Sequence, residues 1–259
     1  MIIISKDNKI IKQVKYLRTK KGRYEHNLFI VEGARFVDEI TGGFNIKYLV
    51  FSQTFTQKNE TGGYHHEYYI VSDKLFNELS DTFAPQGILA VVEQKQYSVD
   101  NLSKGNSFFL IAENIQDPGN LGTLIRTADA AGADAIFLSG NCVDVYNPKV
   151  VRATAGSIFH LPVIENNSLD ILIGHLKRNG IKIYAAHLKG KKYPYEIDLT
   201  ENIAILIGNE GNGLSEYVSR KADLLLKIPM LGMAESLNAS VAGGILLYEV
   251  VRQRINNLC

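Results

Sequence analysis

The stretch "SFFLIAENIQDPGNLGTLIRTADAAGADAIFLSG", residues 107–140, decides the fold class. It opens on a run of apolar residues, which is typical of a strand buried on both faces. Residues 123–132 then read as a helix, and 133–140 form a second apolar run. Buried strands that alternate with helices predict a mostly parallel sheet.

The same alternation continues towards the C-terminus. Further strands are expected at 181–188, 202–210 and 223–230, and further helices at 147–159, 168–180 and 214–222. Asn147 is a suitable N-cap for the first of these helices, with Pro148 in its first position. The second half of the chain is therefore predicted to be an α/β fold, a mostly parallel sheet with helices on both faces.

The first part of the chain predicts a smaller α/β unit. It contains a strand that leads into a helix at 29–40, strands at 46–52 and 87–93, and a helix at 74–80. A polar stretch, "QKQYSVDNLSKGN" at 94–106, separates this part from the apolar strand that follows. Such a stretch marks a domain boundary. We therefore predict an N-terminal domain at 1–95 and a second domain at 107–259.

Composition excludes several classes of protein. With 259 residues, 46% of them hydrophobic and 21% charged, the protein can bury a substantial core and is not intrinsically disordered. Cys142 and Cys259 cannot form a disulfide framework, and free thiols fit a reducing cytoplasm. The N-terminal "MIII" is too short for a signal peptide or membrane span. The histidines lack metal-ligand spacing, so we expect no metal, and His65-His66 is assigned to a surface loop.

Positive charge is concentrated at the N-terminus. Residues 1–25 hold eight Lys and Arg residues against two acids. Five of the eight recur at every third position, which gives a basic stripe along a helix: Lys6, Lys9, Lys12, Lys15 and Arg18. The stripe is either a solvated helix face or a surface that contacts the backbone phosphates of a nucleic acid.

Three loops at the expected carboxyl ends of strands have unusual content, and this is where ligands bind in such sheets. They are "NIQDPGNLGTLIR" (114–126), "IGNEGNG" (207–213) and "IPMLGMAESLN" (228–238). Each alone is a weak signal, since Asp-Pro-Gly-Asn is also a good turn. The glycine-rich loop lacks the endings of a phosphate-binding motif, and Glu210 would repel a phosphate.

The helix that follows the third loop begins with small residues, "ASVAGG" at 239–244. Small side chains allow close packing, either against the sheet or against a second subunit, at a cost of about 1 kcal/mol for each helical glycine. Packing does not explain the polar Ser236 and Asn238, either of which could cap the helix. Together with Glu210 and Arg126, they would form a convergent polar cluster in an apolar pocket.

Taken together, the three loops resemble motifs one, two and three of the SpoU-type (TrmH-like) RNA ribose methyltransferases of the SPOUT superfamily, in order and in spacing. The intervening "NPKVVRATAGSIFHLPV" at 147–163 resembles the ribosomal RNA branch of that family. The resemblance covers residues 107–256. More loosely, the first ninety or so residues resemble the family's N-terminal substrate-recognition domain, which has a ribosomal-protein-like α/β fold.

This resemblance implies methyl transfer from S-adenosylmethionine to a ribose 2′-hydroxyl in RNA, by a homodimer whose methyltransferase domain carries a deep trefoil knot. By similarity, cofactor contacts fall on Gly208, Ile228 and Leu237. Catalytic or substrate-orienting roles fall on Asn120, Arg126, Glu210, Ser236 and Asn238.

Arg126 is expected to hold the phosphate next to the target ribose and to stabilise developing alkoxide charge, because guanidinium stays protonated in proteins. A role as the base is the alternative. Lys149 and Arg152 are candidate phosphate contacts or a solvated pair. Ribosomal RNA is favoured over transfer RNA. The rival functions are a non-catalytic RNA-binding protein of the same fold and a nicotinamide-dependent oxidoreductase, which the missing GxGxxG motif disfavours.

Overall fold

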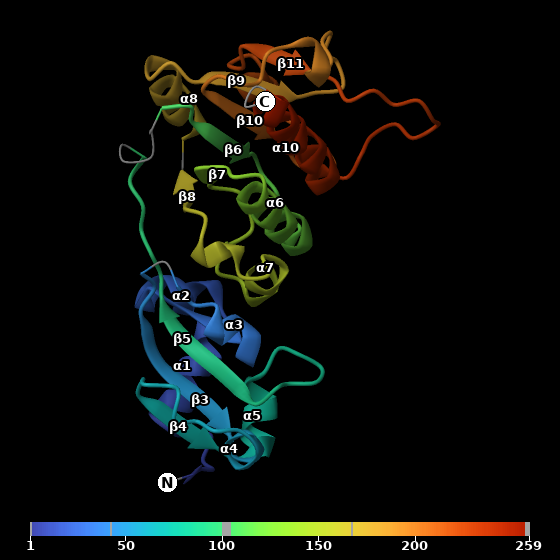
Figure 1. Cartoon of the computed structure of the whole chain (residues 1–259). Coiled ribbons are helices and arrows are strands. Elements are labelled where there is room, and N and C mark those ends of the chain that lie inside the picture. Colours follow the sequence, from blue (N-terminus) through green and yellow to red (C-terminus); the bar gives the residue numbers. More distant parts are fainter. Residues whose placement is uncertain (1, 42, 100–104, 167, 257–259) are drawn as a thin grey trace. The chain divides into compact units, whose positions relative to one another are not determined.

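The computed structural model describes residues 2–41, 43–99, 105–166 and 168–256 (Figure 1). Its contacts divide the protein into two compact units. The first comprises Met1–Lys95 and Tyr146–Phe159, and the second comprises Gln96–Val145 and His160–Cys259. The domain boundaries expected from the sequence stay a prediction. Residues 100–104 of the polar stretch and Cys259 lie outside the described residues.

The first unit is built on a mixed sheet of five strands in the order β1-β4-β3-β5-β2, in which β5 runs antiparallel to both β2 and β3. Its strands are β1 (Ile2–Ile3), β2 (Leu28–Glu32), β3 (Ile46–Ser52), β4 (Tyr68–Val71) and β5 (Ile88–Glu93). Its helices are α1 (Lys9–Leu17), α2 (Lys20–His26), α3 (Ala34–Asp38), α4 (Gln53–Lys58), α5 (Asp73–Leu79), α7 (Pro148–Ala153) and the 3-10 helix η2 (Ser157–Phe159).

Helix α1 shows why these residues fold as they do. The Asn8 side chain accepts a hydrogen bond from the main-chain N–H of Ile10 at 2.9 Å, and this satisfies a donor that the first turn leaves free. Ile11, Val14 and Leu17 recur at helical spacing and are fully buried in the core of the unit. The lysines between them are left on the outer face.

The second unit contains a six-stranded sheet in the order β11-β9-β10-β6-β7-β8, and every strand pair is parallel. The strands are β6 (Phe108–Ala112), β7 (Ala135–Ser139), β8 (Val163–Asn166), β9 (Lys182–Ala186), β10 (Ile203–Ile207) and β11 (Leu224–Leu226). The helices are α6 (Pro118–Ala130), α8 (Leu169–Arg178), α9 (Glu216–Ser219), α10 (Ala239–Asn256) and the 3-10 helix η3 (Pro194–Glu196). The predicted α/β fold with a parallel sheet is confirmed.

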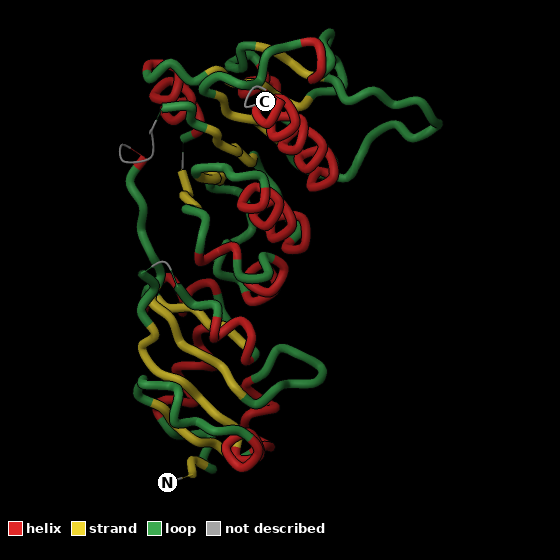
Figure 2. The backbone as a smooth tube through the Cα atoms, in the orientation of Figure 1, coloured by secondary structure: helices red, strands yellow, loops and turns green. Residues whose placement is uncertain are grey.

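Helices cover both faces of this sheet, as Figure 2 shows. Apolar residues of α8 and α9 pack on one face, against alternate residues of β6, β7, β9 and β10. Helices α6 and α10 lie side by side on the other face (Figure 1). The carboxyl ends of the strands are thereby left to the loops, which is where a ligand site forms in such sheets.

Several local expectations need correction. The helix expected at 147–159 ends at Ala153, because Ala155 adopts a left-handed conformation with φ of 49° that a helix cannot continue through. Strands β4 and β8 were not expected, and both are four residues long. His65 and His66 lie exposed in the loop before β4, as expected. Asp117 caps α6, so Asp-Pro-Gly-Asn begins a helix and is not a free turn.

Small residues of α10 allow the close approach of α6. A Cβ atom added at Gly243 would lie 2.4 Å from Cδ2 of Leu124, which is fully buried, whereas one at Gly244 would lie 3.7 Å from Cγ2 of Thr127. The first distance requires a shift of the packed core, and the second is an ordinary contact.

We therefore expect Gly244→Ala to stabilise the protein by up to about 1 kcal/mol, since alanine is the better helix former. Gly243→Ala should lose that gain to overlap with Leu124, and Gly243→Val should destabilise by about 1–3 kcal/mol. Urea unfolding followed by circular dichroism measures all three. Equal stability of the two alanine variants would contradict the close packing described here.

Candidate functional site

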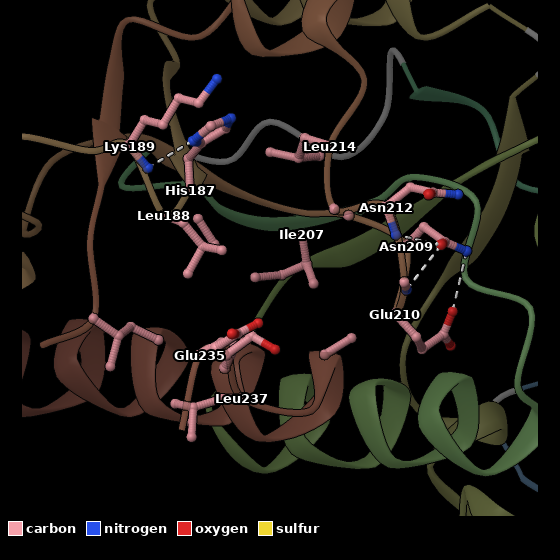
Figure 3. A pocket seen from close by; sticks show the side chains of 18 of the residues that line it. His187, Leu188, Lys189, Ile207, Asn209, Glu210, Asn212, Leu214, Glu235 and Leu237 are labelled. Atoms are coloured by element: carbon pink, nitrogen blue, oxygen red, sulfur yellow. Dashed lines mark hydrogen bonds between the residues drawn. The ribbon is translucent and has the colours of Figure 1, made fainter. Parts of the chain in front are cut away.

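The carboxyl ends of β9 and β10 and the loop before α10 surround a cavity of about 390 Å³ (Figure 3). Gly208, Ile228 and Leu237 all line it, so the three positions expected to contact a cofactor meet in one place. Its apolar walls include Ile207, Leu214, Leu226 and Met230. Apolar walls with a few polar groups are typical of small-molecule sites.

The glycine-rich loop after β10 is held in a tight turn by Asn209. Its main chain exchanges hydrogen bonds of 2.9 and 3.0 Å with Gly213. Its side-chain oxygen accepts from the N–H groups of Gly211 and Asn212, both at 3.0 Å. Asn209 was missed by the sequence analysis, although its place within "GNEGNG" was a signal, since asparagine side chains commonly close turns in this way.

Glu210 ties this loop to the loop that precedes α6. Its carboxylate accepts hydrogen bonds from Asn120 Nδ2 at 3.0 Å, and from the main-chain N–H groups of Asp117 at 3.2 Å and Gln116 at 3.4 Å. Burial acts to raise the pKa of Glu210, but the bonds from Asn120 and from main-chain amides outweigh it, so this pKa is lowered. The carboxylate is thus charged at neutral pH.

Asn120 continues the network to the third loop. Its side-chain oxygen accepts from Asn238 Nδ2 at 2.9 Å. The oxygen of Asn238 in turn accepts from the N–H of Ser240 at 2.9 Å and from the N–H of Val241 at 3.3 Å, as an N-cap of α10 does. Three loops far apart in sequence therefore meet through Glu210, Asn120 and Asn238.

Ser236 lines the same cavity as Glu210. Arg126 is placed differently. It lies exposed on α6, and no hydrogen bond or ion pair joins it to another residue within the described part of the protein. The structure thus joins Asn120, Glu210 and Asn238 by hydrogen bonds, places Ser236 on the cavity that Glu210 also lines, and leaves Arg126 outside this cluster.

Residues at the carboxyl end of β9 form a wall of the cavity that was not expected from the sequence. His187, Leu188 and Lys189 line the cavity opposite Glu235, as Figure 3 shows. His187 Nδ1 accepts from the main-chain N–H of Lys189 at 3.0 Å. The signal was available, because "HLKG" at 187–190 spans the carboxyl end of the expected parallel strand.

The basic residues of the first unit fall into two groups. Lys6 and Lys15 lie 2.6 and 3.3 Å from Glu78. Arg18 and Arg152 share Asp81, at 3.4 and 3.1 Å. These four side chains therefore form ion pairs with acidic residues of the first unit. Lys12 pairs only with the exposed Asp7, while Lys9 and Lys149 have exposed side chains with no ion-pair partner among the residues described.

Metal ligands and membrane spans are both absent from the described ranges. No group of three or more His, Cys, Asp or Glu side chains there could hold a metal ion. No helix there is long and apolar enough to cross a membrane. Cys142 is a half-buried free thiol whose pKa is raised by burial.

Comparisons with known proteins match both parts of the sequence. Residues 107–248 match the SpoU rRNA Methylase family, and residues 8–90 match the MRM3-like substrate binding domain. The Bacillus subtilis 23S rRNA (guanosine(2553)-2′-O)-methyltransferase RlmP is 38% identical over 251 residues, which cover 96% of this chain and 98% of that protein.

Solved structures agree with these matches. The AdoMet-bound rRNA methyltransferase from Sinorhizobium meliloti has a TM-score of 0.86 and 34% identity, covering 97% of each chain. The SpoU methyltransferase AviRb from Streptomyces viridochromogenes, in complex with AdoMet, has a TM-score of 0.88 and 29% identity, covering 96% of this chain and 98% of that one. Matches of sequence and fold over nearly the whole length lead to one conclusion: this chain belongs to the SpoU rRNA methylase family.

Proposed function

We propose that the protein methylates a ribose 2′-hydroxyl of ribosomal RNA, with S-adenosylmethionine as the methyl donor. The observation that carries this proposal is the polar network of Asn120, Glu210 and Asn238 at the edge of the apolar cavity. The relatives that share its full length support it, since RlmP is named for 2′-O-methylation of 23S rRNA.

The residues of the cavity fit the proposed cofactor. S-adenosylmethionine supplies an activated methyl group on a positively charged sulfonium. Leu214, Ile228 and Leu237 offer apolar surface for its adenine, and Glu210 and Glu235 place negative charge in the same cavity. The cofactor's sulfonium and ammonium are both cationic, so charge favours it over a nucleotide phosphate. We assign the contacts with main-chain groups to Gly208, Ile228 and Leu237.

The protein's own residues then have to position the ribose. Holding two reactants in line can supply roughly 7–11 kcal/mol of a barrier. We assign the orientation of the hydroxyl to Asn120, Ser236 and Asn238, and the fixing of the loops to Glu210. Arg126 would hold the neighbouring phosphate and stabilise the alkoxide as it forms.

Arg126 would reach the cluster from a second copy of the protein. Helix α10, which lies beside α6, exposes Val241, Ile245 and Tyr248 by 50%, 42% and 51%. Their spacing of four and three residues puts them on one face of the helix. An exposed apolar face next to an exposed catalytic arginine supports a homodimer. We retain the trefoil knot and a cytoplasmic location as parts of the same proposal.

Ribosomal RNA is proposed over transfer RNA because the N-terminal unit supplies a separate surface for a large substrate. Of the basic positions expected from the sequence, we assign contacts with that RNA to Lys9, Lys12 and Lys149, because Lys15, Arg18 and Arg152 are engaged with Glu78 and Asp81. The proposal is tested by transfer of a tritiated methyl group to ribosomal RNA from a strain that lacks the gene, followed by mapping of 2′-O-methyl sites. RNA binding without any methyl transfer would contradict the proposal and support the rival function, a non-catalytic RNA-binding protein.

Gly208 provides a test of the cofactor site. A Cβ atom there would lie 2.3 Å from the carbonyl carbon of Gly213 and from the amide nitrogen of Leu214, so Gly208→Ala must displace the loop. We expect it to weaken S-adenosylmethionine binding, measured by calorimetry, by at least about tenfold. Gly211→Ala is the matched control, because its Cβ would meet only Asn209 Oδ1, at 3.6 Å. Equal losses in both variants would argue against the assignment.

Arg126 provides a test of the chemistry. Arg126→Ala should keep cofactor binding, since Arg126 does not line the cavity, and should lose methyl transfer by about 10²-fold. Arg126→Lys should recover part of the rate, because it restores the charge but not the planar pair of donors. Turnover close to that of the wild type in the alanine variant would rule out this role.

The homodimer provides a third test. Ile245→Arg places a charge on the apolar face of α10 and should shift the protein from dimer to monomer in sedimentation, with loss of methyl transfer. Ile171→Arg is the control, since Ile171 is 69% exposed on α8, across the sheet from α10. A wild-type protein that sediments as a monomer while fully active would overturn the proposal.

A further inference from the structure

The first unit carries an open hollow beside the basic stripe. It lies over the outer side of α1 and the end of α2, and it is lined by Lys9, Ile10, Lys12, Gln13, Tyr16 and His26. None of the roles assigned so far uses Gln13, Tyr16 or His26.

The charge that remains available on α1 lies at this hollow. Lys15 and Arg18, further along the helix, are engaged with Glu78 and Asp81. Lys9 has no ion-pair partner among the described residues, and its side chain is exposed. Lys12 pairs with Asp7 at 2.9 Å, but the two side chains are 62% and 89% exposed. Such a surface pair contributes little, so a phosphate can replace the carboxylate.

Two rings stand next to these lysines. Tyr16 and His26 pack edge to face, with their centroids 5.9 Å apart. The hydroxyl of Tyr16 donates to a carboxylate oxygen of Glu25 at 2.6 Å, which fixes the orientation of the tyrosine ring. A fixed ring at the wall of an open hollow can stack on a base at low entropic cost.

Gln13 adds a directed hydrogen-bond donor. The hydroxyl of Tyr48, which is buried, donates to Gln13 Oε1 at 2.7 Å and so sets which way the amide points. No residue in the described ranges accepts from Gln13 Nε2. A buried residue thus holds an amide donor at the hollow, ready for an acceptor on the edge of a base.

We propose that this hollow binds an unpaired nucleotide of the RNA substrate. The base would stack on the ring of Tyr16, which His26 supports edge to face, and would accept from Gln13, while the flanking phosphates would contact Lys9 and Lys12. Paired RNA hides the faces of its bases, so these groups select a single-stranded loop or bulge over a duplex. The inference rests on the proposed function for its substrate, and it names the feature of that RNA that the first unit recognises.

The test measures binding of the full-length protein to two fluorescein-labelled RNAs by anisotropy. One is a short oligouridylate, and the other is a blunt RNA duplex of the same length. Tyr16→Leu and His26→Ala should each weaken oligouridylate binding by at least about fivefold and leave duplex binding within about twofold. His26 is exposed, so the second variant is informative even if Tyr16→Leu unfolds. Tyr24→Leu is the matched control, since Tyr24 is 71% exposed on α2 and does not line the hollow.

The lysines should behave differently from the rings. The double variant Lys9→Gln, Lys12→Gln should bind both RNAs more weakly. The slope of log affinity for oligouridylate against log salt concentration should fall in magnitude by about 1–1.5 between roughly 50 and 200 mM salt. The inference would be overturned if His26→Ala left oligouridylate binding unchanged. It would also be overturned if the ring variants lost affinity equally for the two RNAs, or lost no more affinity for oligouridylate than Tyr24→Leu does. Calorimetry with S-adenosylmethionine and methyl transfer by the wild type decide the proposed function separately.

Discussion

The carboxylate of Glu210 joins two loops of the site by hydrogen bonds. Glu210 accepts hydrogen bonds from Asn120 and from the main-chain amides of Gln116 and Asp117, which lie about ninety residues earlier in the sequence. These bonds join the loop before α6 to the loop after β10, and a bond of 2.8 Å from Asn209 Nδ2 to the carbonyl oxygen of Asn114 joins the same two loops. The bonds also keep the carboxylate charged, because a charged acceptor is favoured by the donors that face it. Loop geometry and the charge of the cavity therefore depend on the same group.

Main chain and side chains have separate tasks in this arrangement. The turn after β10 is closed by Asn209, so its amides and carbonyls are fixed before any ligand arrives. The cofactor cavity can thus be specific with few charged side chains, whereas the proposed RNA contacts on the outer face of α1 rely on cations and rings. Neutralisation within the first unit by Glu78 and Asp81 narrows that cationic face to the end near Lys9.

Much of this could be predicted from local sequence. The parallel strands were readable because residues buried on both faces form uninterrupted apolar runs, and Asn147 and Pro148 mark a helix start by their own chemistry. The partners of Lys15 and Arg18 could not be read, because Glu78 and Asp81 are about sixty residues away and only the fold brings them close. That Arg126 lies outside the polar cluster could not be predicted either, since the spacing of residues along α6 does not show which other residues are near the helix.

Helix α7 has a practical consequence for anyone who divides this protein. Its residues sit within the sequence matched to the methylase family, yet they belong to the first compact unit, where α7 contacts β2. Val150 and Val151 are almost completely buried there. A truncated protein that starts at residue 107 would lose β2 and leave these valines uncovered, which favours aggregation. An exchange of the first unit between relatives would likewise have to include α7.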